Sequence, residues 1–338
     1  MNIMKILLYF ESENLISKSG IGRAMKHQLE ALRLAGVDVT TNPKDDYDIL
    51  HINTIGFNSP LIINQARKLG KKVIYHAHST EEDFKDSFIL SNQIAPLYKI
   101  HLKNLYSSAD FIITPTPYSL ELLQHYGITV PMAAVSNGVE PDKYKKDLEK
   151  TKAFYKYFHL SEKDKIVVSA GLYLKRKGII DFMEVARLLP DVTFIWFGHT
   201  AKVALPKDVK VALENHPMNV RLPGYVKGAI FEGAFANADV FFFPSHEETE
   251  VIVVLEALAA KQQVLVRDIG VYKDWLVNGE NCYKGHDNHE FAFIINQLLN
   301  NKLKKVGEAG YQTAQRRTLA IVGQQLKSIY QQVLLFSD

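Results

Sequence analysis

Short, almost wholly apolar segments alternate with longer amphipathic segments along the chain, and this alternation constrains the fold more than any other feature. The apolar segments lack the apolar–polar alternation of a half-exposed strand, so they are typical of strands buried on both faces. Buried strands separated by helices predict parallel sheets covered by helices on both sides. The fold class is therefore α/β.

The pattern runs through the 338 residues twice. The predicted strands are Ile6–Phe10, Ile49–Ile52, Val73–His76, Phe111–Thr114 and Ala133–Val135, then Ile166–Ala170, Thr193–Phe197, Val240–Phe243 and Val264–Val266. The predicted helices are Ile21–Ala35, Pro60–Leu69, Pro96–Tyr106 and Ser119–Tyr126, then Ile179–Leu189, Ala229–Asn237, Val251–Ala260, Phe291–Asn300 and roughly Leu303–Leu335.

Two runs of this kind predict two doubly wound, Rossmann-like domains. We expect an N-terminal domain of residues 1–150, a C-terminal domain of residues 151–320, and a last helix, residues 321–338, that packs back on the N-terminal domain. Such sheets bind ligands beyond the carboxyl ends of their strands, so we expect a ligand in a cleft between the domains.

Composition excludes several classes of protein. The 40 basic and 37 acidic residues leave a net charge of +3, too balanced for a nucleic-acid-binding protein. The single cysteine, Cys282, excludes an internal disulfide framework and a multi-cysteine metal site. Apolar runs fall short of the ~18 residues of a membrane-spanning helix, so we expect a cytoplasmic protein.

The most informative stretch is Pro244–Ala257, in which a buried strand leads into an acidic turn and a helix. Glu248 and Glu256 are too far apart to hold one atom, but they can contact the two ends of an extended ligand over the helix N-terminus, where free amides favour phosphate. The alternative is an acidic first turn that complements the helix dipole, with Glu256 a solvated residue.

Two glycine-containing turns also follow predicted strands. Lys175, Arg176 and Lys177 lie between Gly171 and Gly178, and three cations at a strand-to-helix turn can neutralise a diphosphate; the alternative is a solvated basic loop. Ser19–Arg23 lets the backbone approach a ligand closely, yet it lacks both the dinucleotide-binding and the Walker fingerprints.

Other polar patterns argue against rival chemistries. We expect the imidazoles of His76 and His78 to point in different directions, which is poor geometry for a shared metal; one can donate to a sugar hydroxyl while the other packs. Asp46 and Asp48 have the spacing of a metal site in another class of sugar transferases, but they precede a strand, at the wrong end of the sheet. The chain has no Gly-x-Ser-x-Gly elbow, and Cys282 lacks a nucleophile's setting.

Taken together, these segments resemble glycosyltransferase family 4, retaining enzymes of the GT-B fold. The resemblance runs along the whole chain in order and rests on Gly20, His78, Asn137-Gly138-Val139, Lys177-Gly178, Gly224-Tyr225 and Glu248-x7-Glu256-Ala257. It implies a UDP-hexose donor, no metal and no cofactor. The implied catalytic residues are Glu248, His78 and Lys177; the implied donor-binding residues are Gly20, Arg176, Gly198, Tyr225, Glu250, Val251, Ile252 and Glu256.

The chain departs from the family pattern at two places. Leu172 stands where the family usually has Arg, a loss that Lys175 or Arg176 can offset, and Thr249 and Val251 replace two glycines beside the sugar. This variant loop is similar to that of Gram-positive glycolipid synthases that add a second hexose, usually α-galactose, to glucosyl-diacylglycerol.

The resemblance implies a retaining transferase that moves a hexose, galactose before glucose, to glucosyl-diacylglycerol for membrane glycolipid and lipoteichoic acid anchors. The alternatives are a same-fold transferase acting on capsule, cell-wall or protein-linked glycan, and a noncatalytic sugar-nucleotide-binding subunit. A glycosidase is disfavoured because the two carboxylates lie too far apart in the sequence for the ~5–5.5 Å of the retaining mechanism.

A lipid acceptor predicts peripheral contact with an anionic membrane, on its inner face. Two segments combine lysines with aromatic or aliphatic residues, Lys143–Phe158 and Phe84–Tyr106. Such segments can lie on an anionic surface, where each cation is worth on the order of 1 kcal/mol. The alternative is an ordinary surface helix whose apolar side packs inward.

Overall fold

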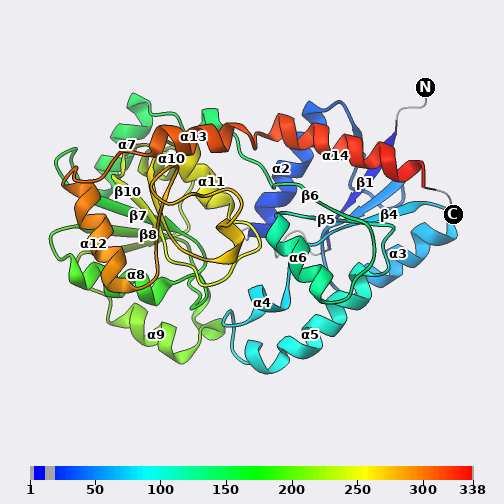
Figure 1. Cartoon of the computed structure of the whole chain (residues 1–338), viewed down its shortest axis with the longest axis horizontal. Coiled ribbons are helices and arrows are strands. Elements are labelled where there is room, and N and C mark those ends of the chain that lie inside the picture. The colour runs from blue at the N-terminus through cyan, green and yellow to red at the C-terminus, as the bar shows by residue number, and fades with distance from the viewer. Residues whose placement is uncertain (1–3, 12–19, 337–338) are drawn as a thin grey trace. The chain divides into compact units, whose positions relative to one another are not determined.

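The computed structural model describes residues 4–11 and 20–336, and its contacts divide the chain into two compact units (Figure 1). Unit 1 comprises Met1–Glu82, Gln93–Gly138 and Arg317–Asp338, and unit 2 comprises Asp83–Asn92 and Val139–Arg316. The division thus falls after Gly138 and again before Arg317, whereas the sequence suggested residues 150 and 320.

Unit 1 is built on a six-stranded parallel sheet of order β2-β1-β3-β4-β5-β6. Its strands are β1 (Lys5–Tyr9), β2 (Asp38–Thr40), β3 (Ile49–Ile52), β4 (Lys72–His76), β5 (Phe111–Thr114) and β6 (Met132–Ala134). One apolar cluster gathers the inner sides of α3 (Ser59–Lys68), α5 (Ser91–Tyr106) and α6 (Pro117–His125). A second gathers those of α2 (Gly20–Leu34) and α14 (Leu319–Leu334). The short helix α4 (Glu81–Phe84) precedes α5.

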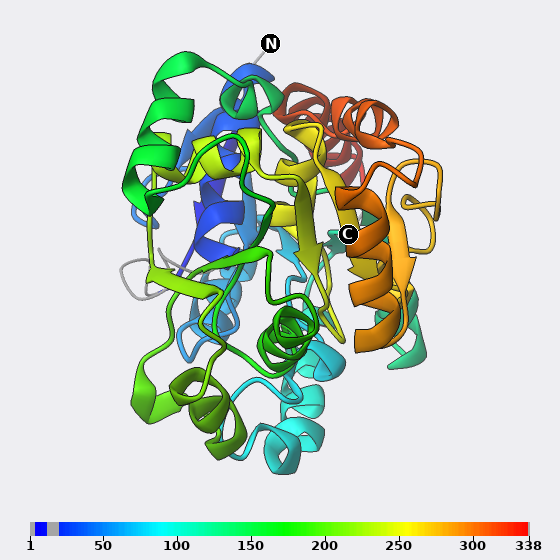
Figure 2. The same cartoon turned by 90° about the vertical axis from the view of Figure 1, so that its left-hand side faces the viewer.

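Unit 2 is also built on a six-stranded parallel sheet, of order β12-β11-β10-β7-β8-β9. Its strands are β7 (Ile166–Ala170), β8 (Thr193–Phe197), β9 (Val220–Gly224), β10 (Val240–Phe243), β11 (Gln263–Arg267) and β12 (Tyr283–Gly285). Its α-helices, which cover both faces of the sheet (Figure 2), are α7 (Leu148–Phe158), α8 (Ile179–Leu188), α9 (Lys207–Glu214), α10 (Ala229–Asn237), α11 (Ile252–Ala259), α12 (Asn288–Leu299) and α13 (Gly307–Gln315). The strand order reverses between β7 and β10, which is where a doubly wound sheet binds its ligand.

The predicted α/β class with two parallel sheets is confirmed. The sequence missed β2, β9 and β12, each of which is an edge strand. An edge strand needs fewer buried apolar residues, and β9 even contains Pro223, whose missing N–H an edge tolerates. The single predicted helix Leu303–Leu335 was wrong: it is divided into α13 and α14, because the Thr318 side chain caps a new helix start by accepting from the Ile321 amide.

The last helix, α14, packs along α2 inside unit 1 (Figure 1). Gly323 lies at the contact: a Cβ there would come within 2.0 Å of the Ala31 carbonyl oxygen and 3.2 Å of the Ala35 Cβ. The two backbones can approach this closely because position 323 carries no side chain.

Replacing Gly323 with Ala should therefore destabilise unit 1, although Ala favours an exposed helix interior by about 1 kcal/mol over Gly. The collision with backbone at Ala31 outweighs that gain, and we expect a net loss of about 2 kcal/mol or more. Chemical denaturation measures the effect, with Ser328→Ala on the exposed side of α14 as the control. Equal or higher stability of G323A would contradict the close helix contact.

Candidate functional site

The carboxyl ends of β7 and β10, where the strand order of unit 2 reverses, are followed by the two loops that the sequence singled out. Gly178 ends the first loop with φ of 78°, and a Cβ there would lie 2.4 Å from the carbonyl oxygen of Pro244 in the second loop. Only glycine combines this left-handed conformation with so close an approach. The two loops are therefore held against each other.

Gly198, directly after β8, performs a similar role one strand away. Its φ is 146°, its amide donates to the Gly224 carbonyl at 2.8 Å, and a Cβ would lie 1.9 Å from the Gly171 oxygen. The ends of β7, β8 and β9 therefore meet at Gly198. Its predicted part in donor binding stays a prediction.

Glu248 is the centre of the site. Its side chain is buried, 2% exposed, and both carboxylate oxygens accept from the Lys177 ammonium at 2.6 Å. The Arg176 guanidinium adds an ion pair at 3.3 Å. Burial lowers the pKa of Lys177, and the Glu248 carboxylate opposes that shift. The structure thus brings together two of the three residues predicted to be catalytic.

The helix that follows, α11, begins only at Ile252, so Glu248 lies in the preceding loop and not in the first helical turn. The alternative of an acidic first turn is therefore wrong for Glu248. Glu256 lies within α11 and is buried, which excludes the alternative of a solvated helix residue. The loop residues Glu250 and Val251 lead into the N-terminus of α11, whose first residue is Ile252.

The three cations of the first loop have different surroundings. Lys175 is half exposed and pairs with Asp208 at 3.1 Å. Arg176 is buried and pairs with Asp83 at 2.8 Å; burial acts to lower its pKa, but the nearby carboxylates outweigh burial and raise it. Lys177 alone pairs with Glu248 through both oxygens.

The remaining donor-binding candidates lie at chain segments open to a ligand. Tyr225, 42% exposed, follows β9, and the Lys227 ammonium lies 5.3 Å from its ring centroid. Gly20, in unit 1, begins α2, and a Cβ there would meet no described atom within 4 Å. Ser19, which precedes it in the sequence motif, lies outside the described residues.

His78 belongs to a buried polar cluster at the carboxyl end of the unit 1 sheet. Its ring stacks on that of His76, with centroids 4.2 Å apart and planes 4° from parallel. The expectation that the two rings point in different directions was wrong, because residues two apart in an extended chain share a face. His78 Nε2 donates to the Asn53 side-chain oxygen at 2.9 Å.

The hydrogen bonds around His76 determine which ring nitrogens carry protons. The Gln28 amide donates to His76 Nδ1 at 2.9 Å, so that nitrogen is an acceptor. His51 Nε2, 3.2 Å from the same atom, is then the donor. His51 Nδ1 in turn accepts from the Tyr330 hydroxyl at 2.6 Å. A chain of hydrogen bonds thus runs from α14 to the end of β4.

Burial makes these histidines poor bases. It lowers the pKa of His51 to about 3 and that of His78 to about 4, and it lowers the pKa of His76 well below its ordinary value. His78 is therefore a neutral hydrogen-bonding group at physiological pH. Asn53 and Gln28 were not predicted from the sequence. Asn53 could have been, because it follows β3 as His78 follows β4, and the carboxyl ends of neighbouring parallel strands lie at one edge of the sheet.

Rival chemistries find no support at the positions that the sequence considered. Asp48 accepts from the Lys5 amide and Asp46 pairs with Lys71. Both carboxylates therefore make contacts at the amino ends of the strands. Within residues 4–11 and 20–336, no cluster of His, Cys, Asp and Glu could hold a metal ion. Cys282 is buried, which raises the pKa of its thiol to about 12.

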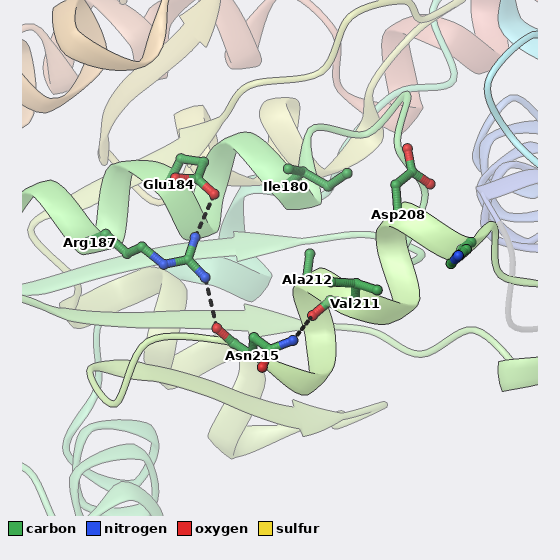
Figure 3. A pocket seen from close by; sticks show the side chains of 8 residues that line it. Ile180, Glu184, Arg187, Asp208, Val211, Ala212 and Asn215 are labelled. Atoms are coloured by element: carbon green, nitrogen blue, oxygen red, sulfur yellow. Dashed lines mark hydrogen bonds and ion pairs between the residues drawn. The ribbon is translucent and has the colours of Figure 1, made fainter.

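A hollow of about 790 Å³ lies between α8 and α9 (Figure 3). It is lined by Ile180, Glu184, Arg187, Lys207, Asp208, Val211, Ala212 and Asn215. None of the predicted site residues lines this hollow, and it lies on a helical face instead of the strand ends. The chemistry of the chain therefore points to the Glu248 site.

Each unit is doubly wound on a parallel sheet, and a cation–carboxylate site lies at the strand switch point of unit 2. This architecture is that of glycosyltransferases of the GT-B class, and the family matches agree. Residues 152–316 match the family model of glycosyl transferases group 1, and residues 31–143 match that of Glycosyltransferase Family 4. HepE of Anabaena, solved with UDP-glucose, superposes over 97% of this chain and 100% of its own with a TM-score of 0.78 at 16% identity, a likeness of fold alone.

Two relatives are more similar in sequence. The processive diacylglycerol alpha-glucosyltransferase of Acholeplasma laidlawii is 46% identical over 98% of this chain and 99% of its own length. The alpha-galactosylglucosyldiacylglycerol synthase of Streptococcus pneumoniae is 27% identical over 90% and 83%. The chain belongs to glycosyltransferase family 4, and it is an enzyme that transfers a hexose.

The buried histidines predict a specific acid sensitivity. Their pKa values are lower in the folded state than the ~6.5 of an unfolded chain, so the unfolded state binds more protons below that pH. Above pH ~6.5 these neutral histidines do not reduce the free energy of unfolding. As the pH drops from ~6.5 toward 4, the free energy of unfolding falls because the unfolded chain takes up the protons. We expect each histidine to remove roughly 1–2 kcal/mol of unfolding free energy between pH 6.5 and 5.

Urea unfolding across this pH range tests the prediction. His51→Gln should reduce the loss of unfolding free energy between pH 6.5 and 5 by the roughly 1–2 kcal/mol expected of one buried histidine. His125→Gln, at an exposed position in unit 1, should leave the loss unchanged. Identical pH profiles for wild type and H51Q would contradict the assignment.

Proposed function

We propose that this protein transfers glucose from UDP-glucose to a diacylglycerol-type lipid, with retention of the α configuration. The observation that carries the proposal is the 46% identity to a diacylglycerol alpha-glucosyltransferase along nearly the whole of both chains. The sequence pattern favoured galactose; the 27% identity to the galactosyl enzyme is weaker support, so the proposal moves to glucose.

The site geometry is consistent with a metal-independent transfer. In the proposal Lys177 and the amides at the N-terminus of α11 stabilise the negative charge of the departing UDP. Glu248 contacts the transferred hexose, and Glu256 holds the ribose hydroxyls. The incoming diphosphate then competes with Glu248 for the Lys177 ammonium, which Glu248 holds at 2.6 Å in this structure.

A lipid acceptor requires a surface that meets the membrane, and α5 in unit 1 offers one. Ala95, Leu102 and Leu105 face the core, while Ile94, Leu97 and Ile100 are exposed. Leu97 is 69% exposed, and Lys103 lies on the same helix. We propose that this face of α5 lies on the anionic inner surface of the cell membrane.

The other candidate segment, Lys143–Phe158, exposes fewer apolar side chains than α5, chiefly Leu148 and Tyr157. Tyr144, Phe154 and Phe158 are buried, and α7 packs against α10 within unit 2. Lys150 pairs with Glu232 at 3.2 Å. For these aromatic residues the alternative of an inward-packed surface helix holds. Among the described residues, no helix has the length and apolarity needed to cross a bilayer.

The proposed reaction predicts UDP release from UDP-glucose that depends on lipid. We expect release in mixed micelles containing diacylglycerol or glucosyl-diacylglycerol, at least 10-fold faster than with UDP-galactose. A coupled UDP assay and thin-layer chromatography of the lipids measure both. Faster release with UDP-galactose would identify galactose as the transferred hexose, and no release with either lipid would contradict a lipid acceptor and favour a soluble glycan acceptor.

Glu248→Gln is the matched inactive control for this assay. It preserves side-chain volume while removing the carboxylate, and we expect turnover to fall at least 100-fold while UDP affinity stays within a few-fold. Glu256→Gln should instead weaken UDP binding. Equal effects of the two substitutions on turnover and UDP binding would contradict their separate roles.

Membrane contact through α5 predicts that Leu97→Asp weakens binding to vesicles containing phosphatidylglycerol at least 10-fold. Leucine insertion is worth about 1.5–3 kcal/mol, and the substitution also adds a repelled charge. Vesicle co-sedimentation measures the loss. Met218→Asp, at a fully exposed position in unit 2, is the control and should bind like wild type; equal loss in both variants would contradict a role of α5.

A further inference from the structure

The segment Asp83–Asn92 groups by its contacts with unit 2, although the residues on either side belong to unit 1. Arg176 holds it with three separate groups. Its backbone amide donates to the Asp86 carbonyl at 3.2 Å, its Nε donates to Ser87 Oγ at 3.1 Å, and its Nη1 pairs with Asp83 at 2.8 Å. One residue, through its backbone and its side chain, thus fixes the segment beside the Glu248 loop.

Local hydrogen bonds hold the segment in an unfavourable backbone conformation. Asp86 and Leu90 have φ of 52° and 65°, and for leucine this left-handed conformation is unfavourable. The Asn92 side chain stabilises the bend, accepting from the Asp86 amide at 2.8 Å and donating to the Asp86 carboxylate at 3.0 Å. Strained backbone of this kind persists where surrounding contacts hold it, and it is concentrated at functional sites.

The charge balance argues against Arg176 as a diphosphate ligand. Its Nη1 lies between two carboxylates, Asp83 at 2.8 Å and Glu248 at 3.3 Å, and also donates to the Glu247 carbonyl at 2.6 Å. Arg176 and Lys177 carry two positive charges and Asp83 and Glu248 carry two negative charges, so this cluster is already neutral. A planar, five-donor group in this setting orients its partners.

Asp83 is the more exposed of the two carboxylates in this cluster. Its side chain is 21% exposed, compared with 8% for Arg176 and 3% for Glu248. A carboxylate has about four lone-pair sites, so an ion pair leaves capacity for hydroxyl donors. Charge-assisted hydrogen bonds from sugar hydroxyls to such a group are strong.

We propose that Asp83 binds the hydroxyl groups of a sugar already attached to the acceptor, and that Arg176 is the positioning residue that fixes Asp83 beside Glu248. The assignment rests on the proposed function, in which Glu248 contacts the transferred hexose. Asp83 and Glu248 flank the same Arg176 nitrogen, which places acceptor sugar and donor hexose side by side. Asp83 therefore distinguishes glucosyl-diacylglycerol, with its several hydroxyls, from diacylglycerol, which has one.

The test compares KM for the two lipids in mixed micelles, together with UDP and UMP affinity by calorimetry. Asp83→Asn should raise KM for glucosyl-diacylglycerol at least 10-fold and KM for diacylglycerol less than 3-fold, with UDP affinity within 2-fold. Asp191→Asn, the same chemical change at an exposed position of unit 2, should leave all values within 2-fold. Should D83N fold poorly, Asp83→Glu keeps the ion pair and should still raise the glucosyl-diacylglycerol KM selectively.

Arg176→Lys separates positioning from phosphate binding. As a positioning residue, Arg176 affects the glucosyl-diacylglycerol KM while the ratio of UDP to UMP affinity stays constant; a selective loss of UDP affinity would overturn this role. An unchanged or equally raised KM for both lipids in D83N and D83E would overturn the Asp83 assignment alone. A wild-type enzyme inactive with both lipids would overturn the proposed function, and the assignment with it.

Discussion

The pairing of the buried Glu248 carboxylate with Lys177 and Arg176 is the interaction on which the candidate site of unit 2 depends. A carboxylate that is almost wholly buried must be paired, because an unpaired buried charge costs several kcal/mol. Lys177 and Arg176 supply that pairing from the loop after β7. Their side chains reach Glu248 only because Gly178 lets the loop lie directly against Pro244 after β10. The glycine, the cations and the acidic loop are therefore parts of one electrostatic arrangement.

In unit 1 the buried histidines are stabilised as neutral groups, whereas Glu248 is stabilised by ion pairs. Burial keeps His51, His76 and His78 neutral, and the ring N–H groups of His51 and His78 donate to His76 and to Asn53. The Tyr330 hydroxyl comes from α14, nearly the last helix turn of the chain, so this network is completed only when α14 packs against unit 1. His78 is thereby oriented by residues distant in sequence.

The sequence predicted the central strands and the class of the site because both depend on local patterns. Buried strands such as Phe111–Thr114 are recognisable from their apolar composition, and Glu248 and Lys177 from their position after a strand. The missed edge strands β2, β9 and β12 lacked that composition. The pairing of Arg176 with Asp83 could not be predicted, since residues so far apart in sequence meet only through tertiary folding, and three adjacent cations look equivalent until their partners are known.

The departures from the family pattern have a structural explanation in the same loop. Val251 has φ of −112°, an extended conformation that a β-branched residue favours, so the loop does not need glycine there. Thr249 and Val251 are both buried, and their side chains therefore fix the loop conformation by packing. Arg176 is paired with Asp83 and Glu248, so the proposed function assigns the diphosphate to Lys177 and the amides of α11 instead.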